Sequence, residues 1–245
     1  MAPKENAGPR RPGRTQATVE VAVQPPASPQ SHAVTLTDKQ VGRLSQYRRC
    51  LQSLPPGSDT VFSHRLAFLC GFSSAQVRRD LMAIGFTGSP ARGYVVSQLI
   101  GAIASCLDAP GGQHAALVGV GNLGRAILDY FALKRPSLSI VAAFDIDPQK
   151  ADRVLYGCRT YRMDRLAEIV REEKIEVGIL TVPGAAAQSV ADLLVSVGVR
   201  SLLNFAPQAL RLPPNCYVEE MDIAASMEKA AYFARALSAG REGKA

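Results

Sequence analysis

The sequence predicts an α/β protein with a small helical domain, a doubly wound parallel sheet and a final helix. Three observations predict this order. Short amphipathic helices fill residues 35–107, apolar strands alternate with amphipathic helices between residues 115 and 204, and an alanine-rich helix follows residue 221. Continuous apolar strands separated by helices are typical of parallel sheets covered on both faces. The predicted divisions are residues 1–34, 35–110, 111–220 and 221–245.

Composition limits the class of protein. The chain has 245 residues, of which 47% are hydrophobic and 20% charged, as in ordinary globular proteins. It contains no run of about 18 apolar residues, and its first residues are basic and proline-rich where a signal peptide would be apolar. We therefore expect a cytoplasmic protein that does not enter a membrane. The net charge of +7 suits a polyanionic partner.

The cysteines indicate neither a disulfide framework nor a metal site. They lie far apart in the chain, and no Cys-x-x-Cys spacing occurs among them. Buried free thiols are the favoured interpretation, and no metal is expected. The cysteines are Cys50, Cys70, Cys106, Cys158 and Cys216.

Residues 1–34 are predicted to be a disordered tail. Proline, glycine, serine and glutamine dominate this stretch, and it has almost no large apolar residue that could anchor it to a core. Its basic residues could contact nucleic-acid phosphates without any fold, although a solvated tail is the favoured interpretation.

A helix-turn-helix is predicted near the start of the folded chain. Thr37 and Asp38 begin a first helix, which the prolines after Leu54 end. Ser63 begins a short second helix, and after a turn that starts at Gly71 a third helix covers Ser74 to Ile84. The third helix should present Gln76, Arg78 and Arg79 outward, as a recognition helix does.

A small hairpin should follow the third helix. Glycines recur at turn spacing between Gly85 and Tyr94, with Arg92 exposed, as in the wing of a winged helix. Residues 35–110 hold eight lysines and arginines against four aspartates, so the basic excess of the folded chain gathers here. This pattern predicts a winged-helix DNA-binding domain. A small helical packing domain with solvated arginines stays open as the alternative. Val95 to Leu107 should form a connecting helix before the linker 108–112.

The stretch Gly119-Val120-Gly121-Asn122-Leu123-Gly124 is the strongest motif in the chain. An apolar strand, 115–118, precedes it and a helix reaching about Lys134 follows. Glycines at this spacing permit a tight turn, close approach of a pyrophosphate and close packing of the helix on the strand. The motif alone is weak, because such turns also occur without a ligand.

A second feature supports a dinucleotide. The next apolar strand, 138–144, ends at Asp145, about twenty residues after the glycines, with Asp147 beyond it. A carboxylate at this place can accept hydrogen bonds from the adenosine ribose and would repel a 2′-phosphate, which favours NAD over NADP. Later strands end in further candidate ligand-facing residues, Thr181, Val182 and Pro183, and then Asn204, Phe205 and Pro207. The pattern predicts a Rossmann-type domain that binds NAD(H).

No catalytic acid or base is evident beside this site, although a lysine base stays open among Lys134, Lys150, Lys174 and Lys229. A dehydrogenase needs an acid or base beside the nicotinamide, yet the histidines end at His114, and no substrate domain follows. A bound nucleotide without chemistry indicates a sensor rather than an enzyme. Two alternatives stay open: an NAD(P)-dependent oxidoreductase with an accessory helical domain, and a winged-helix regulator whose Rossmann domain no longer binds nucleotide.

Seven stretches in order resemble the Rex family of redox-sensing transcriptional repressors. The resemblance covers nearly the whole chain from Leu36 to Leu237. The matching stretches are 74–81, the wing ending at Gly93-Tyr94, 119–124, 144–148, 180–183, 204–207 and Met221-Asp222. The resemblance implies a homodimer that binds double-stranded operator DNA when NAD⁺ prevails and leaves it when NADH binds. It implies DNA-contacting residues at Ser74, Gln76, Arg78, Arg79, Arg92 and Tyr94.

The resemblance also implies a switch and a dimer contact. Arg49, Tyr130 and Asp222 occupy the positions that match the family's switch residues. In that switch the aspartate forms a hydrogen bond or ion pair with either the arginine or the tyrosine. The C-terminal helix is exchanged between subunits in that family, which would explain its broad apolar face. The sequence departs from the family in the wing, where Ser89-Pro90 replaces a usual basic pair, so fewer phosphate contacts are expected.

Overall fold

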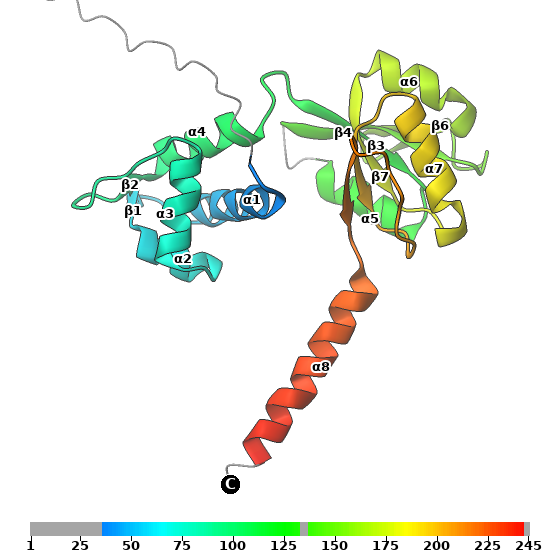
Figure 1. Ribbon diagram of the computed structural model, residues 1–245. Coiled ribbons are helices and arrows are strands. Elements are labelled where there is room, and N and C mark those ends of the chain that lie inside the picture. The colour runs from blue at the N-terminus through cyan, green and yellow to red at the C-terminus, as the bar shows by residue number, and fades with distance from the viewer. Residues whose placement is uncertain (1–35, 133–136, 243–245) are drawn as a thin grey trace, which may run out of the picture. The chain divides into compact units, whose positions relative to one another are not determined.

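The computed structural model describes residues 36–132 and 137–242, with side chains as far as Leu237 (Figure 1). A helical domain comes first along the chain, a mostly parallel sheet follows, and a long helix comes last, so the predicted α/β fold class is confirmed. The predicted tail, residues 1–34, lies outside the described residues, as does Lys134.

The first domain is a winged helix. Helices α1 (Asp38–Gln52), α2 (Ser63–Cys70), α3 (Ser74–Ala83) and α4 (Val96–Leu107) enclose one apolar core, to which Leu44, Leu66, Val77, Leu81 and Leu99 contribute. Strand β1 (Thr60–Val61) pairs antiparallel with β2 (Tyr94–Val95), which closes the wing. The inner face of α3 includes one charged residue, because Asp80 is buried beside Val77 and Leu81, whereas Ala75 is exposed.

Two glycines shape the wing. A side chain at Gly88 would lie 2.6 Å from Cδ1 of the Tyr94 ring, which packs into the core at 8% exposure. Gly93 has a φ of +70°, and its Cβ would meet the carbonyl oxygen of Val61 at 2.6 Å. The predicted hairpin therefore forms because glycine allows both of these close approaches.

The second domain is a doubly wound sheet of seven strands in the order β5-β6-β4-β3-β7-β8-β9. All its pairings are parallel except that between β5 and β6. The strands are β3 (Gln113–Val118), β4 (Leu138–Asp145), β5 (Val154–Leu155), β6 (Cys158–Arg162), β7 (Ile175–Leu180), β8 (Ser201–Asn204) and β9 (Tyr217–Glu220). The crossover helices are α5 (Asn122–Phe131), α6 (Leu166–Glu172), which follows a short 3₁₀ turn at Met163–Arg165, and α7 (Gly184–Ser196).

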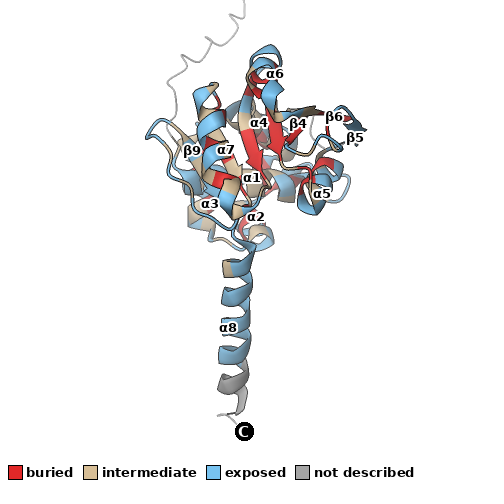
Figure 2. Ribbon diagram, turned by 90° about the vertical axis from the view of Figure 1, so that its right-hand side faces the viewer, coloured by how far each residue is buried: buried red, intermediate tan, exposed pale blue. Residues whose placement is uncertain are grey.

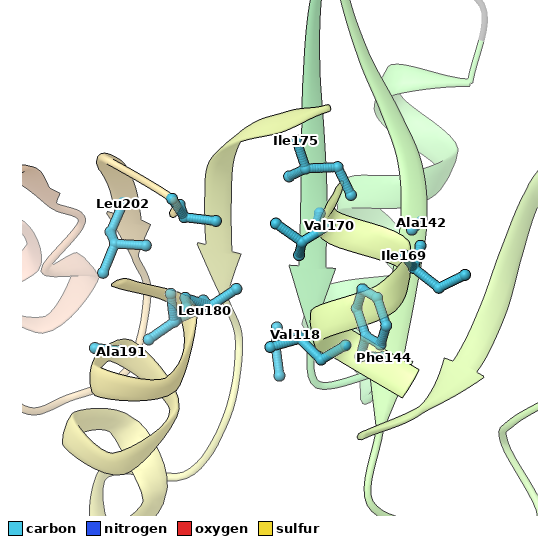
Figure 3. Packing of buried hydrophobic residues seen from close by; sticks show 13 residues of the cluster. Val118, Ala142, Phe144, Ile169, Val170, Ile175, Leu180, Ala191 and Leu202 are labelled. Atoms are coloured by element: carbon cyan, nitrogen blue, oxygen red, sulfur yellow. The ribbon is translucent and has the colours of Figure 1, made fainter. Parts of the chain in front are cut away.

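Alternation along the strands builds a core on each face of the sheet. Ala116 and Val118 of β3 pack with Phe144, α6 and α7 on one face, where Figure 3 shows Val118 beside Phe144. On the other face, Ala115 and Leu117 pack with Leu128 of α5. Successive residues of a strand point to opposite faces, so one apolar run serves both layers. Figure 2 shows that buried residues concentrate in these central strands.

The differences from the prediction include one helix end and two strands. Helix α5 ends at Phe131, before the predicted end at Lys134. Strands β5 and β9 were not predicted, because β5 has two residues and β9 is mostly exposed, so neither forms an apolar run. The final helix is α8 (Ile223–Glu242), which follows residue 221 as predicted. Among the described residues, no helix combines the length and apolar character needed to cross a bilayer.

Candidate nucleotide cavity and nucleic-acid interface

The glycine turn between β3 and α5 is fixed by close contacts. Gly119 has a φ of +102°, and a Cβ there would meet the carbonyl oxygen of Thr181 at 2.6 Å. A Cβ at Gly124 would collide with the carbonyl oxygen of Gly119, so α5 can approach the strand only with glycine at this position. The Thr181 hydroxyl donates to the Gly119 carbonyl oxygen at 2.7 Å and joins the turn to β7. Both glycines are structural requirements of this turn.

Gly121 has a different environment. A Cβ built at this position has nothing within 4 Å, and the residue lines a cavity of 690 Å³ at the carboxyl ends of the strands. Gly121 is also the N-cap of α5, whose first amides lack intrahelical acceptors and form a favourable site for an anion. The open space and these donors fit a dinucleotide pyrophosphate. The volume lies in the range of cofactor pockets.

Asp145 holds the turn from the end of β4. Its side chain is 7% exposed, and its Oδ2 accepts the Val120 amide at 2.8 Å and lies 3.3 Å from Lys150 Nζ. Its Oδ1 accepts only the amide of Asp147, at 2.9 Å, among the described residues. Since Asp145 lines the cavity, the remaining lone pair of Oδ1 is suited to a ribose hydroxyl.

The cavity brings together only part of the predicted cofactor set. Gly119, Gly121, Asp145, Asp147 and the stretch Thr181–Pro183 line it. Seven further lining residues were not predicted to bind the cofactor: Val118, Ile146, Lys150, Met163, Ala186, Ser189 and Val190. The spacing of Ile146 and Lys150 just after Asp145 could have indicated these two, whereas the others come from the end of β3, the 3₁₀ turn before α6, and α7.

The remaining predicted cofactor residues do not line this cavity. Val120 is fully buried under the turn, and Asn122, Leu123 and Gly124 belong to the first turn of α5. The Asn204 amide donates to Glu220 Oε2 at 2.6 Å and to the Gln208 carbonyl oxygen, and its oxygen accepts the Ala206 amide. Asn204 thus supports the loop that contains Phe205 and Pro207. A cofactor role for these residues stays a prediction.

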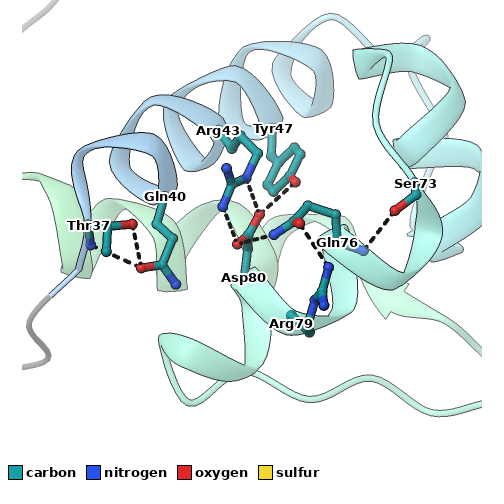
Figure 4. Close-up of polar contacts among 8 residues, drawn as sticks. All are labelled: Thr37, Gln40, Arg43, Tyr47, Ser73, Gln76, Arg79 and Asp80. Carbon is teal, nitrogen blue, oxygen red and sulfur yellow. Dashed lines mark hydrogen bonds and ion pairs between the residues drawn. The ribbon is translucent and has the colours of Figure 1, made fainter.

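The third helix presents its two arginines differently. Arg78 Nη1 donates to the Ser63 hydroxyl at 3.1 Å and lines a hollow of 320 Å³ between the start of α2 and the wing. Arg79 Nη2 instead donates to Gln76 Oε1 at 3.0 Å (Figure 4). Both arginines are exposed, as predicted for a recognition helix.

The other predicted DNA-binding residues divide into exposed and buried ones. Arg92 is exposed at the tip of the wing, between Ser89 and Gly93, whose backbones pair. Ser74 is the partly exposed first residue of α3. Tyr94 packs into the core, and only an edge of it faces the hollow beside Arg78. A DNA contact by Tyr94 would therefore involve that edge alone.

The predicted switch residues lie on three separate elements. Arg49 is exposed near the end of α1, and Tyr130 of α5 is 54% exposed and packs edge-to-face on Phe131. Asp222 Oδ1 accepts the Ala225 amide at 2.8 Å at the start of α8. Across residues 36–132 and 137–242, no ion pair joins Arg49 to Asp222 in this single chain. A relay among the three stays a prediction.

Fold and site together define a winged-helix protein with a nucleotide-binding α/β domain. Family models match the two domains separately: "CoA binding domain" matches residues 112–208, and "Putative DNA-binding protein N-terminus" matches residues 37–81. The chain belongs to the Rex family of redox-sensing transcriptional repressors, as its similarity to curated members over most of its length shows.

Two relatives and two solved structures illustrate this membership. The Rex repressor of Syntrophobacter fumaroxidans is 38% identical over 78% of this chain and 91% of its own. The Rex repressor of Listeria welshimeri is 37% identical over 78% of this chain and 89% of its own. The Rex-family repressor RSP superposes with a TM-score of 0.75 at 25% identity, over 86% of this chain and 99% of its own. The structure of RSP in complex with β-NAD⁺ and operator DNA gives a TM-score of 0.76 at 26% identity, over 86% of this chain and 97% of its own.

These comparisons confirm the resemblance found in the sequence. They confirm the predicted class of transcriptional repressor, and they disfavour the oxidoreductase alternative, because the matching relatives are repressors over the same domains.

Proposed function

We propose that this protein is a repressor that binds operator DNA through its winged helix and releases it when NADH occupies the cavity beside Gly121. One observation carries this proposal: the chain joins a recognition helix with two exposed arginines to a glycine turn that opens into a cavity lined by Asp145. The first feature suits DNA and the second suits a dinucleotide.

The solved relatives support both halves of the proposal. RSP was solved with β-NAD⁺ and operator DNA together, and also with β-NADH, where it matches this chain with a TM-score of 0.74. The two cofactor forms differ by one charge on the nicotinamide ring, which provides the signal. A ligand shifts a conformational equilibrium only by its differential affinity for the two states.

The chain's own residues would hold the cofactor as follows. The free amides at the start of α5 would bind the pyrophosphate, since Gly121 leaves room for it to approach. Asp145 would accept a ribose hydroxyl at Oδ1 while its Oδ2 keeps the Val120 amide in place. Ile146, which is 89% exposed, and Met163 would offer apolar surface to the adenine.

The NADH to NAD⁺ ratio should control DNA binding. The probe is the duplex that the protein enriches from a randomised library in NAD⁺, and its binding is measured by fluorescence anisotropy at constant total cofactor. We expect affinity to fall as NADH replaces NAD⁺. DNA binding that is indifferent to this ratio would refute the sensor proposal.

Calorimetry separates the sensor from a repressor that has lost its nucleotide site. We expect the wild type to bind NADH and Asp145→Ala to bind it more weakly. Equal and negligible binding by both proteins would favour the regulator with a degenerate Rossmann domain.

Arg78→Ala should weaken DNA binding equally for all sequences. The Arg78 guanidinium lies beside Ser63 at the start of α2, where a backbone phosphate could meet both the charge and the helix amides. Losing one phosphate contact should reduce the slope of log affinity against log salt by about 1. Arg162→Ala, which removes the same charge from an exposed site outside the winged helix, should leave the slope unchanged. A selective loss for the enriched duplex would instead make Arg78 a base-reading residue.

We also propose a homodimer formed through α8. Figure 2 shows that the described part of α8 is mostly exposed in the single chain. Its exposed residues include five large apolar ones: Ile223, Met227, Tyr232, Phe233 and Leu237. Such a surface is typical of an oligomeric contact. Because a repressor must reach chromosomal DNA, we further propose that the protein is cytoplasmic.

A double substitution in α8 should give monomers. In Met227→Glu/Phe233→Glu the new carboxylates would have to be desolvated at the proposed contact. Light scattering should then report a mass near 26.1 kDa, whereas the wild type should give twice that value. Lys229→Glu introduces a carboxylate at an exposed polar position of the same helix and should stay dimeric. A dimeric double variant would contradict the proposed contact.

A further inference from the structure

A buried carboxylate joins α1 to the recognition helix. Asp80 of α3 is 1% exposed, and its Oδ2 accepts Arg43 Nε at 2.6 Å and the Tyr47 hydroxyl at 2.9 Å. Its Oδ1 accepts Arg43 Nη2 at 2.8 Å and Gln76 Nε2 at 2.9 Å (Figure 4). Arg43, Tyr47, Gln76 and Asp80 form what we call the Asp80 network. The two parallel hydrogen bonds from Arg43 hold the carboxylate in one orientation, and the positive charge of Arg43 stabilises its ionised form.

The Asp80 network keeps this carboxylate ionised. Burial alone would raise the pKa of Asp80, but hydrogen bonds from Arg43, Tyr47 and Gln76, together with the charge of Arg43, lower it below its usual value. An ionised carboxylate accepts hydrogen bonds and donates none, so it determines which end of the Gln76 amide faces it.

Gln76 transmits this orientation to the surface. Because Nε2 faces Asp80, Oε1 points the other way and accepts Arg79 Nη2 at 3.0 Å. Gln76 was predicted to contact DNA, yet both ends of its amide have partners within the domain. Arg79 is the exposed end of a chain of bonds that begins at Arg43 and passes through Asp80.

We propose that Asp80 and Gln76 are positioning residues, which hold the Arg79 guanidinium in the orientation that reads an operator base before DNA arrives. The proposal rests on the proposed DNA-binding function. A side chain that is ordered in advance loses less entropy on binding. Arg78, held at Ser63 by a separate bond, is outside this chain of contacts and serves as the internal comparison.

A double-mutant cycle tests the proposal. Affinities are measured for Gln76→Ala, Arg79→Ala and the double variant, on the duplex enriched by the wild type and on a scrambled duplex of equal length. We expect Gln76→Ala to lower the specificity ratio by about three- to tenfold, the size of ordering one side chain. We expect no further loss when Gln76→Ala is added to Arg79→Ala, because the effect acts through Arg79. In the matched cycle with Arg78→Ala, the two effects should multiply.

The outcomes distinguish this proposal from the function on which it rests. If the effects of Gln76→Ala and Arg79→Ala multiply, Gln76 contacts DNA itself and the positioning role is wrong. If the wild type enriches no duplex, the proposed DNA-binding function fails. The positioning role is then judged by NMR, since the Arg79 Nε–H signal should be ordered in the wild type and averaged in Gln76→Ala. Should Gln76→Ala not fold, Gln76→Met keeps the side-chain length and enters the same cycle.

Discussion

Replacing Asp80 by alanine should lower the free energy of unfolding of the winged helix by about 3 to 5 kcal/mol, because it leaves a partly buried charge without its partner. Arg43 is only 18% exposed in its side chain and gives two bonds to this carboxylate. The Tyr47 hydroxyl, which is fully buried, would lose its acceptor as well. Urea unfolding followed by circular dichroism measures the loss, and hydrogen exchange of residues 38–107 assigns the transition to this domain.

The cost of Asp80→Ala should depend on pH in one direction. The folded state lowers the pKa of Asp80 below the ordinary value of 3.8, so the stabilisation is complete above that pH. It should be lost as pH falls through the lower, folded pKa, where the native carboxylate takes up a proton. The wild type and Asp80→Ala should therefore differ most near neutral pH and converge in strong acid.

An exposed ion pair provides the control for Asp80→Ala. Glu168 lies near Arg165 on the surface, where both side chains are about half exposed, and Glu168→Ala should change stability little. If Asp80→Ala were as mild as Glu168→Ala, or if its cost grew towards acid pH, the Asp80 network would not be the contact that joins α1 to α3.

The Asp80 network shows where prediction from sequence ended. The helices and the wing depend on helix caps, glycines and the spacing of apolar residues, which are local features that can be identified in the sequence. Asp80 repeats at helical spacing with Val77 and Leu81, so its inner position was available from the pattern. Its partners were not, because Arg43 and Tyr47 lie on a different helix and a lone aspartate in a basic helix is usually solvated.

The residues that line the cavity also fall into those that the sequence predicts and those that it does not. Gly119, Gly121 and Asp145 were predictable because their spacing follows from one strand, one turn and the next strand. Met163, Ser189 and Val190 come from later units and reach the cavity only through the order of strands in the sheet. Strand β9 was missed for a related reason, since its exposed residues carry no apolar signal and its pairing with β8 is a tertiary event.

Gly121→Val should abolish most NADH binding while leaving the protein folded. The position has space for a side chain, with nothing within 4 Å of a Cβ, and its φ of −85° does not require glycine. That space is where we place the pyrophosphate, so affinity should fall by about a hundredfold, which corresponds to about 2.7 kcal/mol. Calorimetric titration with NADH measures the loss, and an unchanged thermal melt shows that the fold persists.

Gly124→Ala makes the comparison decisive, because the smaller substitution should do the greater harm to the fold. Its methyl group would collide with the Gly119 carbonyl oxygen, and overpacking of this kind costs about 1 to 3 kcal/mol. Gly101→Ala, at an open and exposed position of α4, should keep both stability and NADH affinity.

Normal NADH binding by a folded Gly121→Val would place the pyrophosphate elsewhere, whereas unfolding of that variant would mean that Gly121 serves the turn rather than the ligand. Loss of binding by a folded Gly121→Val, beside a lowered stability of Gly124→Ala, would assign Gly121 to the cofactor and Gly124 to the packing of α5 on β3.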